Sequence, residues 1–148
     1  MKILHVADTH LGYSAYRKST EKGINQREID VYNAFEQFID YAIKTCPDLI
    51  IHAGDLFDAV RPNNRAITFA INQLIRLSEN QIPIVVISGN HEQPKLQETG
   101  HIFSIFDHIE YIYPVYNSKY EKHIFDLKQG SLAMHAVPQC NNKKDYDN

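Results

Sequence analysis

The sequence predicts an α/β fold, a layered domain built on a parallel or mixed sheet with crossover helices. Three short apolar runs, at 3–7, 49–51 and 84–87, have the length and β-branched content of buried strands. Between them, two longer segments repeat their apolar residues every three or four positions, as amphipathic helices do. Strands alternating with helices in this order are typical of a parallel sheet whose strands are joined by helical crossovers.

The two helical segments have recognisable ends. The first covers 29–43 and is expected to stop before Pro47, because proline disfavours helical dihedral angles in the residue that precedes it. The second covers 66–77 and follows a Pro-Asn-Asn turn. Both segments are therefore expected to pack their apolar stripes on the sheet.

In the last third of the chain, the sequence pattern predicts shorter strands, at 111–113, 124–127 and 132–134. A Lys-Gln-Gly turn separates the last two, which indicates a hairpin. Residues 141–148 are polar and charged without any period, so they are expected to form a frayed end. We therefore expect one domain over 1–140.

Composition narrows the class of protein. At 148 residues with 43% hydrophobic and 22% charged content, the chain is an ordinary globular domain and not a disordered or collagen-like one. No apolar run reaches the roughly 20 residues that cross a bilayer, so we expect a cytoplasmic protein without a membrane span. The net charge of -3 gives no overall basic footprint for nucleic acid. Cys46 and Cys140 are too few for a disulfide framework.

Polar motifs follow each of the first three strands. Asp8 and His10 come after the first, and their spacing of two directs both side chains to the same side if the chain stays extended. Gly12 then lets the backbone turn away. Taken alone, an Asp-x-His tripeptide is common and has no specific meaning.

Asp55 follows the second strand, directly after Gly54. One carboxylate can bind two cations at once, and cations that share a bridging ligand lie about 3.5 to 4 Å apart, the arrangement that hydrolyses phosphate esters. Asp55 is the candidate bridge. Asp58 is expected to cap the turn or to orient a ligand.

The third motif is Gly-Asn-His-Glu at 89–92. Asn90 offers a neutral amide oxygen, which leaves a cation site more positive and so better able to receive a phosphate. His91 is the next residue and points elsewhere, so it is expected to steady the phosphoryl oxygens or to protonate the leaving oxygen. Each motif alone is weak, but three in order, each after a buried strand, form a strong signal.

The remaining histidines have ordinary explanations. His5 and His52 lie inside strand patterns, where a core histidine is the commoner case. A second group sits in helical or turn contexts that face solvent as easily as anything else. These are His101, His108 and His123. His135 is the only late histidine on a strand pattern, and it has a minority chance of reaching a metal.

These motifs together resemble the calcineurin-like metallophosphoesterase superfamily, whose pattern runs Asp-x-His, Gly-Asp, Gly-Asn-His-Asp/Glu and then a late Gly-His-x-His. The sequence is most similar to one branch, the nuclease subunit (Mre/SbcD type) of the DNA double-strand-break repair complex. The resemblance covers most of residues 1–113. It is carried by the stretches at 8–13, 26–35, 52–62 and 82–91.

The resemblance implies a nuclease that uses two Mn²⁺ ions, with 3′-to-5′ exonuclease and single-strand endonuclease activity on DNA ends. It also implies a Rad/SbcC-type ATPase partner and a homodimer. The dimer candidates are the helix at 66–77 and the apolar segment at 102–106, whose side chains could equally be ordinary core. By motif position the implied metal ligands are Asp8, His10, Asp55 and Asn90, with His91 as the catalytic residue that binds no metal.

The sequence departs from the family pattern at its end, since no Gly-His-x-His follows. We therefore expect the N-terminal part of the catalytic domain, incomplete at its C-terminus and inactive alone. The first ion would keep Asp8, His10 and Asp55, while the second would keep only Asp55 and Asn90 and bind weakly.

Two other functions remain open. A small-molecule or protein phosphoesterase shares all three motifs, because fold alone does not set the substrate. Against it stand four residues that could contact a nucleic acid backbone and bases. These are Tyr13, Arg17, Arg27 and Arg61. The third possibility is a non-catalytic dimerisation or scaffold module.

Overall fold

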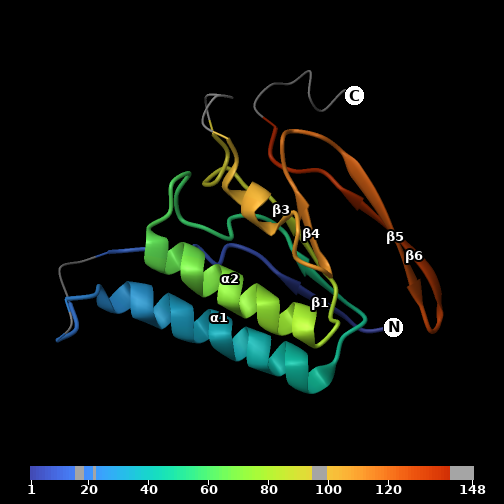
Figure 1. Ribbon diagram of the computed structural model, residues 1–148, viewed down its shortest axis with the longest axis horizontal. Helices are drawn as coiled ribbons and strands as arrows, with labels where there is room; N and C mark the ends of the chain where they lie inside the picture. Colours follow the sequence, from blue (N-terminus) through green and yellow to red (C-terminus); the bar gives the residue numbers. More distant parts are fainter. Residues whose placement is uncertain (16–18, 22, 95–99, 141–148) are drawn as a thin grey trace.

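The computed structural model describes residues 1–15, 19–21, 23–94 and 100–140 (Figure 1). Arg17 and the segment 141–148 lie outside the described residues. The elements in chain order are β1 (Ile3–Val6), α1 (Gln26–Thr45), β2 (Leu49–His52), α2 (Asn64–Glu79), β3 (Ile84–Ile87), the short 3₁₀ helix η2 (Ile102–Phe106), β4 (Ile112–Val115), β5 (Glu121–Leu127) and β6 (Gly130–Ala136).

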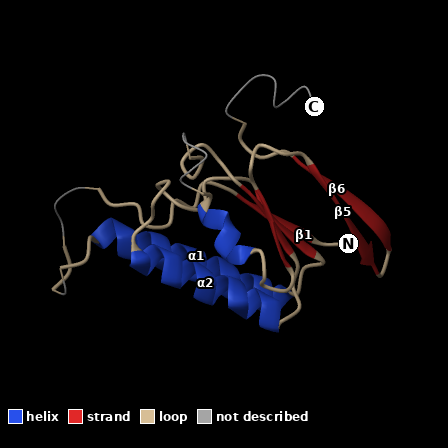
Figure 2. Ribbon diagram, turned by 45° about the horizontal axis from the view of Figure 1, so that its top comes forward, coloured by secondary structure: helices blue, strands red, loops and turns tan. Residues whose placement is uncertain are grey.

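The central sheet has four parallel strands in the order β1-β2-β3-β4. Parallel crossovers are almost always right-handed, so adding each strand on the same side sends every crossover to the same face. The structure follows this rule, with α1 and α2 side by side on one face and the antiparallel hairpin β5–β6 on the other (Figure 2). The result is a helix layer, a parallel sheet and a two-stranded sheet.

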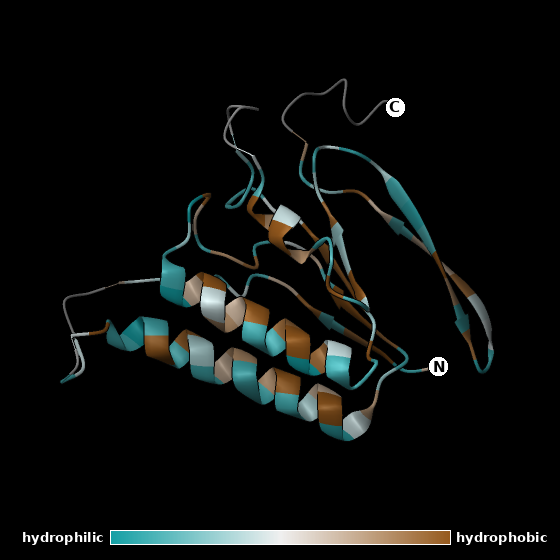
Figure 3. Ribbon diagram, in the orientation of Figure 1, coloured by the Kyte–Doolittle hydropathy of each residue, from teal (hydrophilic) through white to brown (hydrophobic). Residues whose placement is uncertain are grey.

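Each face of the sheet has its own hydrophobic cluster, because successive strand residues point to opposite faces. The helix side includes Phe35, Ile50, Leu74 and Phe103. The hairpin side is built from Leu49, Val85, Val115, Phe125 and Ala136. Hydrophobic and hydrophilic residues alternate along both long helices (Figure 3), and most of the buried residues of each helix are hydrophobic.

The predicted fold class and element order are confirmed. The helix α1 ends where proline required, with Cys46 as its C-cap in a left-handed conformation. The fourth strand begins one residue later than predicted, because Tyr111 has a φ of 64° and belongs to a turn. The predicted hairpin is present, with both strands longer than the apolar runs alone indicated.

The core position expected for His5 was wrong, and the structure decides the placement of His101, which the sequence left open. His5 is exposed, because β1 is an outer strand of the described sheet. His101 is buried, and its Nδ1 accepts a hydrogen bond from the N–H of Phe103 at the start of η2. Burial lowers the pKa of His101 to about 4.

Many of the apolar residues in the segments proposed for a dimer contact belong to the core. Along α2, Ala66, Ala70, Leu74 and Leu77 are all fully buried. Phe103 and Phe106 of η2 are fully buried as well. No helix within the described ranges is long and apolar enough to span a bilayer.

A buried carboxylate ties the starts of the two long helices together. Glu28 of α1 is 4% exposed and accepts hydrogen bonds from Tyr32 Oη at 2.7 Å and from Arg65 Nη1 at 3.0 Å. It also accepts one from Asn63, the N-cap residue of α2. The loop after β2 is therefore anchored to α1.

We predict that Glu28→Gln lowers the free energy of unfolding by about 1–3 kcal/mol, because an amide cannot accept hydrogen bonds at both terminal atoms. Urea denaturation measures the change. The control Glu36→Gln alters an exposed side chain of the same helix and should shift stability by under about 0.5 kcal/mol. Equal effects of the two changes would contradict the prediction.

Acid should destabilise the fold through His101. Its pKa of about 4 in the folded chain lies below its ordinary value of 6.5, so the unfolded chain binds more protons between these pH values. The free energy of unfolding should therefore fall as the pH drops from 6.5 to 4. His101→Asn keeps a capping acceptor without this titration, and urea denaturation should show a shallower decline over the same window. A decline as steep as that of the unaltered protein would contradict the assignment.

Candidate metal centre

The strand register brings the three motif loops to one edge of the sheet. Val6 pairs with His52, and His52 pairs with Val86, so β1, β2 and β3 end at the same level. Backbone hydrogen bonds then join the first two loops directly. The N–H of Asp8 donates to the carbonyl of Gly54, and that of His10 to the carbonyl of Asp55, each at 3.0 Å. The polar residues after each strand therefore meet.

Three of the predicted ligands have left-handed backbone conformations. The φ angles are 56° at Asp8, 45° at His10 and 53° at Asp55. Such a conformation costs a residue other than glycine about 1–3 kcal/mol and persists only where neighbouring contacts impose it. Here the paired backbone hydrogen bonds impose it. Strained backbone of this kind clusters at functional sites, which supports a site at this edge.

Gly89 lets the third loop approach the second. A Cβ at this position would lie 2.0 Å from Asp55 Oδ1 and 2.5 Å from the Asp55 backbone nitrogen. The same carboxylate oxygen accepts a hydrogen bond from the N–H of His91 at 3.1 Å. Glycine is therefore required here because the Asp55 carboxylate fills the space that any side chain would need.

Glu92 links the second and third loops through hydrogen bonds to its buried carboxylate. It is fully buried, and its two oxygens accept from the N–H groups of Phe57 at 2.8 Å and Gly89 at 3.0 Å. Burial raises the pKa of Glu92 to about 7, although the two N–H groups act in the opposite direction. Glu92 stands in the third motif, but nothing in the sequence pattern shows that its side chain turns inward.

The predicted residues form two overlapping groups. In the first, ligand atoms of His10, Asp55 and His91 all lie within 4.8 Å of one another. The second is a pocket of about 290 Å³ whose lining includes Asp8, Asp55 and Asn90. Asp55 belongs to both groups. The structure thus brings together all five residues singled out from the three motifs.

His91 has one nitrogen occupied. Its Nδ1 lies 2.9 Å from the carbonyl oxygen of Asp58, which can only accept, so Nδ1 carries a proton. This hydrogen bond raises the pKa of His91, with a smaller contribution from the carboxylate of Asp55. The other nitrogen, Nε2, is left for exchange of a proton or for a ligand.

His10 supplies a donor atom suited to a cation. Its Nδ1 is buried and makes no hydrogen bond within the described part of the chain, although Asp58 Oδ1 lies 3.3 Å away. The ring of His10 packs edge-on against that of His91, with 4.6 Å between centroids. Asp58 therefore lies beside both imidazoles, where a carboxylate can orient them.

Part of the pocket lining comes from a segment that the sequence motifs do not include. Val137, Pro138 and Gln139 follow β6 and line the pocket together with the motif loops. The N–H of Gln139 donates to the carbonyl of Ser88 at 2.9 Å, which holds this segment against the end of β3. No sequence motif marks these residues, because only the path of the hairpin brings them back.

Other predicted contacts lie around this edge or away from it. Tyr13 follows the first motif and is 40% exposed, and Arg61 is exposed beyond the second. Arg27, on the first turn of α1, lies 3.5 Å from Asp30. His135 is exposed on β6 and hydrogen-bonds Tyr120, and the described site does not include it.

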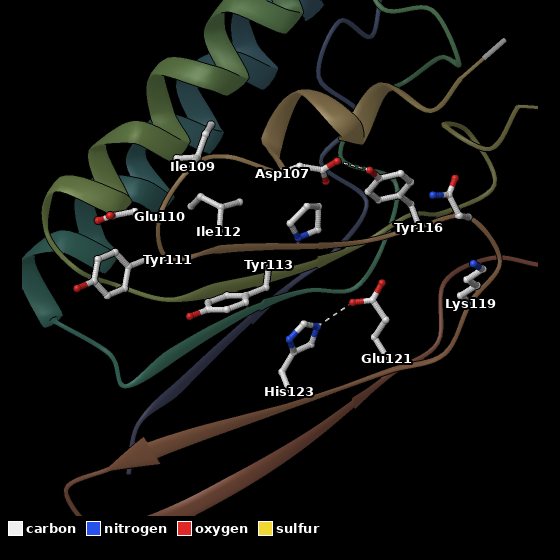
Figure 4. Close-up of a pocket in the computed structure, with 12 residues that line it drawn as sticks. Asp107, Ile109, Glu110, Tyr111, Ile112, Tyr113, Tyr116, Lys119, Glu121 and His123 are labelled. Atoms are coloured by element: carbon white, nitrogen blue, oxygen red, sulfur yellow. Dashed lines mark hydrogen bonds and ion pairs between the residues drawn. The ribbon is translucent and has the colours of Figure 1, made fainter.

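A larger pocket lies between β4 and β5 (Figure 4). Its volume is about 620 Å³, and its side chains include Tyr113, Glu121 and His123. Glu121 and His123 form an ion pair at 3.2 Å, and Tyr113 packs on the same imidazole. None of the motif residues lines it. The candidate centre is therefore the smaller pocket at the strand ends.

The donor set suits a divalent cation that prefers oxygen ligands and tolerates imidazole, as Mn²⁺ does. Carboxylates come from Asp8 and Asp55, an imidazole from His10 and an amide oxygen from Asn90. The ligand atom that His10 offers lies within 4.8 Å of those of Asp55 and His91, so these side chains are close enough to meet at a cation. The residues therefore fit a metal.

Loops at the carboxyl ends of parallel strands that converge on carboxylate, imidazole and amide donors form a candidate site for divalent cations. The chain belongs to the calcineurin-like phosphoesterase family, whose pattern matches residues 1–145. It is similar to the DNA double-strand break repair protein Mre11 of Methanococcus maripaludis, with 35% identity over 99% of this chain and 38% of that protein. Mre11 of Sulfurisphaera tokodaii is 50% identical over 64% of this chain and 23% of its own length.

The chain thus spans 38% or less of the length of these two relatives. Among solved structures, a dimetal phosphatase from Danio rerio has a TM-score of 0.41 and 13% sequence identity. The match covers 62% of this chain and 29% of that one.

We predict that Gly89→Ala displaces the Asp55 carboxylate and weakens Mn²⁺ binding by roughly tenfold or more, as measured by titration calorimetry. The control Gly23→Ala adds a methyl group in open space and strains only the backbone, whose φ is +74°. It should reduce stability by about 1–2 kcal/mol and leave Mn²⁺ affinity unchanged. Equal Mn²⁺ affinities of the two variants would contradict the role given to Gly89.

Proposed function

We propose that this chain carries the N-terminal, metal-binding part of the catalytic domain of a DNA nuclease that hydrolyses phosphodiester bonds with two Mn²⁺ ions. The observation that carries the proposal is the position of Asp55, which is shared by the His10–His91 group and by the Asp8–Asn90 pocket. A bridging carboxylate must face both ions of a pair, and the presence of Asp55 in both groups supports this role.

The proposed ligands divide between two ions. Asp8, His10 and Asp55 hold the first, and Asp55 with Asn90 holds the second. Two protein ligands bind a cation weakly, so the second ion should dissociate more readily. Bound divalent ions polarise a phosphoryl oxygen and lower the pKa of a bound water.

His91 is the proposed catalytic residue. Its Nδ1 proton is directed to the carbonyl of Asp58, so the ring orientation is fixed and Nε2 is the reactive atom. Nε2 can carry a proton, which the ring can donate to the leaving oxygen of the phosphodiester. Asp58 keeps the ring in this orientation. The structure also places His91 within reach of the ligand group, so metal binding and catalysis need separate measurements.

DNA is the proposed substrate because both relatives named above are double-strand break repair proteins. The proposed activities are 3′-to-5′ exonuclease and single-strand endonuclease. Tyr13 and Arg61 are exposed around the motif loops, where an aromatic ring can stack on a base and a guanidinium can pair with a phosphate. Arg27 is a further candidate, and Arg17 lies outside the described residues.

The proposed partners follow from the same similarity. They are a Rad/SbcC-type ATPase and a second copy of the chain, acting at DNA ends in the cytoplasm or nucleoid. Because the buried residues of α2 and η2 belong to the core, a dimer contact would use exposed side chains of these elements. Ile75 and Ile105 are each 37% exposed.

His91→Asn should separate catalysis from metal binding. In a longer chain that contains residues 1–148, we predict that the change lowers Mn²⁺-dependent hydrolysis of single-stranded DNA by on the order of 100-fold, because the proton donor is lost. Mn²⁺ affinity, measured by calorimetry, should stay within about threefold because His91 binds no ion in this scheme. A large loss of affinity would show that His91 is a ligand.

A substrate comparison tests the class of enzyme. The Mn²⁺-loaded chain is incubated with labelled single-stranded DNA and with para-nitrophenyl phosphate, with Asp55→Asn as the negative control. Hydrolysis of DNA supports the nuclease. Hydrolysis of para-nitrophenyl phosphate alone would favour the small-molecule phosphoesterase. If the chain binds Mn²⁺ and cleaves neither substrate, residues 1–148 alone form a non-catalytic module, which the weak binding of the second ion predicts. For the proposal to stand, a longer chain that contains these residues must then cleave DNA.

A further inference from the structure

Thr9 stands between two proposed ligands whose backbone is strained. Asp8 and His10 both have positive φ angles, of 56° and 45°. The N–H groups of Asp8 and His10 donate hydrogen bonds to the second loop. Thr9, which lies between them, contacts that loop through its side chain. The side chain of Thr9 can therefore add to the backbone hydrogen bonds in orienting both ligands.

The hydroxyl of Thr9 is held by two groups of the second strand and its loop. Oγ1 donates to the carbonyl of Leu56 at 3.2 Å, and it lies 2.9 Å from Nε2 of His52. A threonine hydroxyl has one proton, so Oγ1 must accept from His52 when it donates to Leu56. His52 is therefore the tautomer with its proton on Nε2.

His52 is suited to a fixed, uncharged role. It is fully buried at the end of β2, and the centroid of its ring lies 6.5 Å from that of the Phe35 ring. Burial lowers the pKa of His52 to about 4, so the imidazole is neutral at ordinary pH. Its Nδ1 has no hydrogen-bond partner among the described residues, so Thr9 is the contact that fixes the ring through a nitrogen.

We propose that His52 is a positioning residue that acts through Thr9 to hold Asp8 and His10 in the orientation that binds a divalent cation. This inference rests on the proposed function, because the cation is the one assigned to the strand-end pocket. It gives a role to a histidine that the sequence places inside a strand, where packing alone is the ordinary explanation.

Packing and positioning make different demands on the two side chains. If Thr9 served packing alone, only its volume would matter. Thr9→Val should then leave Mn²⁺ binding unchanged, because valine has the same shape. If Thr9 positions the ligands through its hydroxyl, Thr9→Val should weaken Mn²⁺ binding and Thr9→Ser should not. At position 52 the matched pair is His52→Phe, which keeps a ring without a donor, and His52→Gln, which keeps an N–H group near the place of Nε2.

Calorimetry with Mn²⁺ provides the first readout. Thr9→Val should weaken binding by roughly tenfold or more, and Thr9→Ser should stay within about threefold of the unaltered chain. His52→Phe should behave like Thr9→Val, with partial recovery in His52→Gln. Urea denaturation of each variant shows whether it is folded. Binding by Thr9→Val within about twofold of the unaltered chain would overturn the inference.

Amide hydrogen exchange provides a second readout that needs no metal. The amides of Asp8 and His10 donate to Gly54 and Asp55, so their exchange reports directly on the orientation of the loop. It should accelerate in Thr9→Val and remain slow in Thr9→Ser. If the unaltered chain bound no Mn²⁺, the proposed function would fail, and unchanged exchange in Thr9→Val would separately refute the positioning role.

Discussion

The parallel register of β1, β2 and β3 is the constraint on which the site depends. Because Val6, His52 and Val86 stand level, the three loops leave the sheet at the same height and can bond to one another. A shift of one strand by a single residue would turn its side chains to the opposite face. It would also separate Asp8 from the carbonyl of Gly54. Hydrophobic clusters on both faces of the sheet enforce the register.

Much of the fold could be predicted because strand and helix leave different periodicities in the sequence. The run at 84–87 has no polar residue, and it became a strand with the same bounds. Local patterns carried less information where tertiary contacts decide the outcome. Tyr111 has a strand-like composition around it but occupies a turn, and His5 lies in a strand that is not covered.

The candidate site could be predicted as residue types at strand ends, but its internal organisation could not. Asp8, His10, Asp55 and Asn90 stand in recognisable motifs, so their convergence follows from parallel topology. The inward turn of Glu92 depends on two N–H groups 35 and three residues away in the chain. The wall formed by 137–139 depends on the return path of the hairpin, which no local pattern encodes.

The left-handed backbone at Asp8 and Asp55 has a consequence for how such a site changes over time. Aspartate and asparagine tolerate this conformation better than most residues, because their short polar side chains bond locally. Replacement by asparagine therefore removes a negative charge while leaving the loop in its shape. Evolution can silence the chemistry at these positions without dismantling the scaffold, so a relative can keep every loop in place and still have lost its reaction.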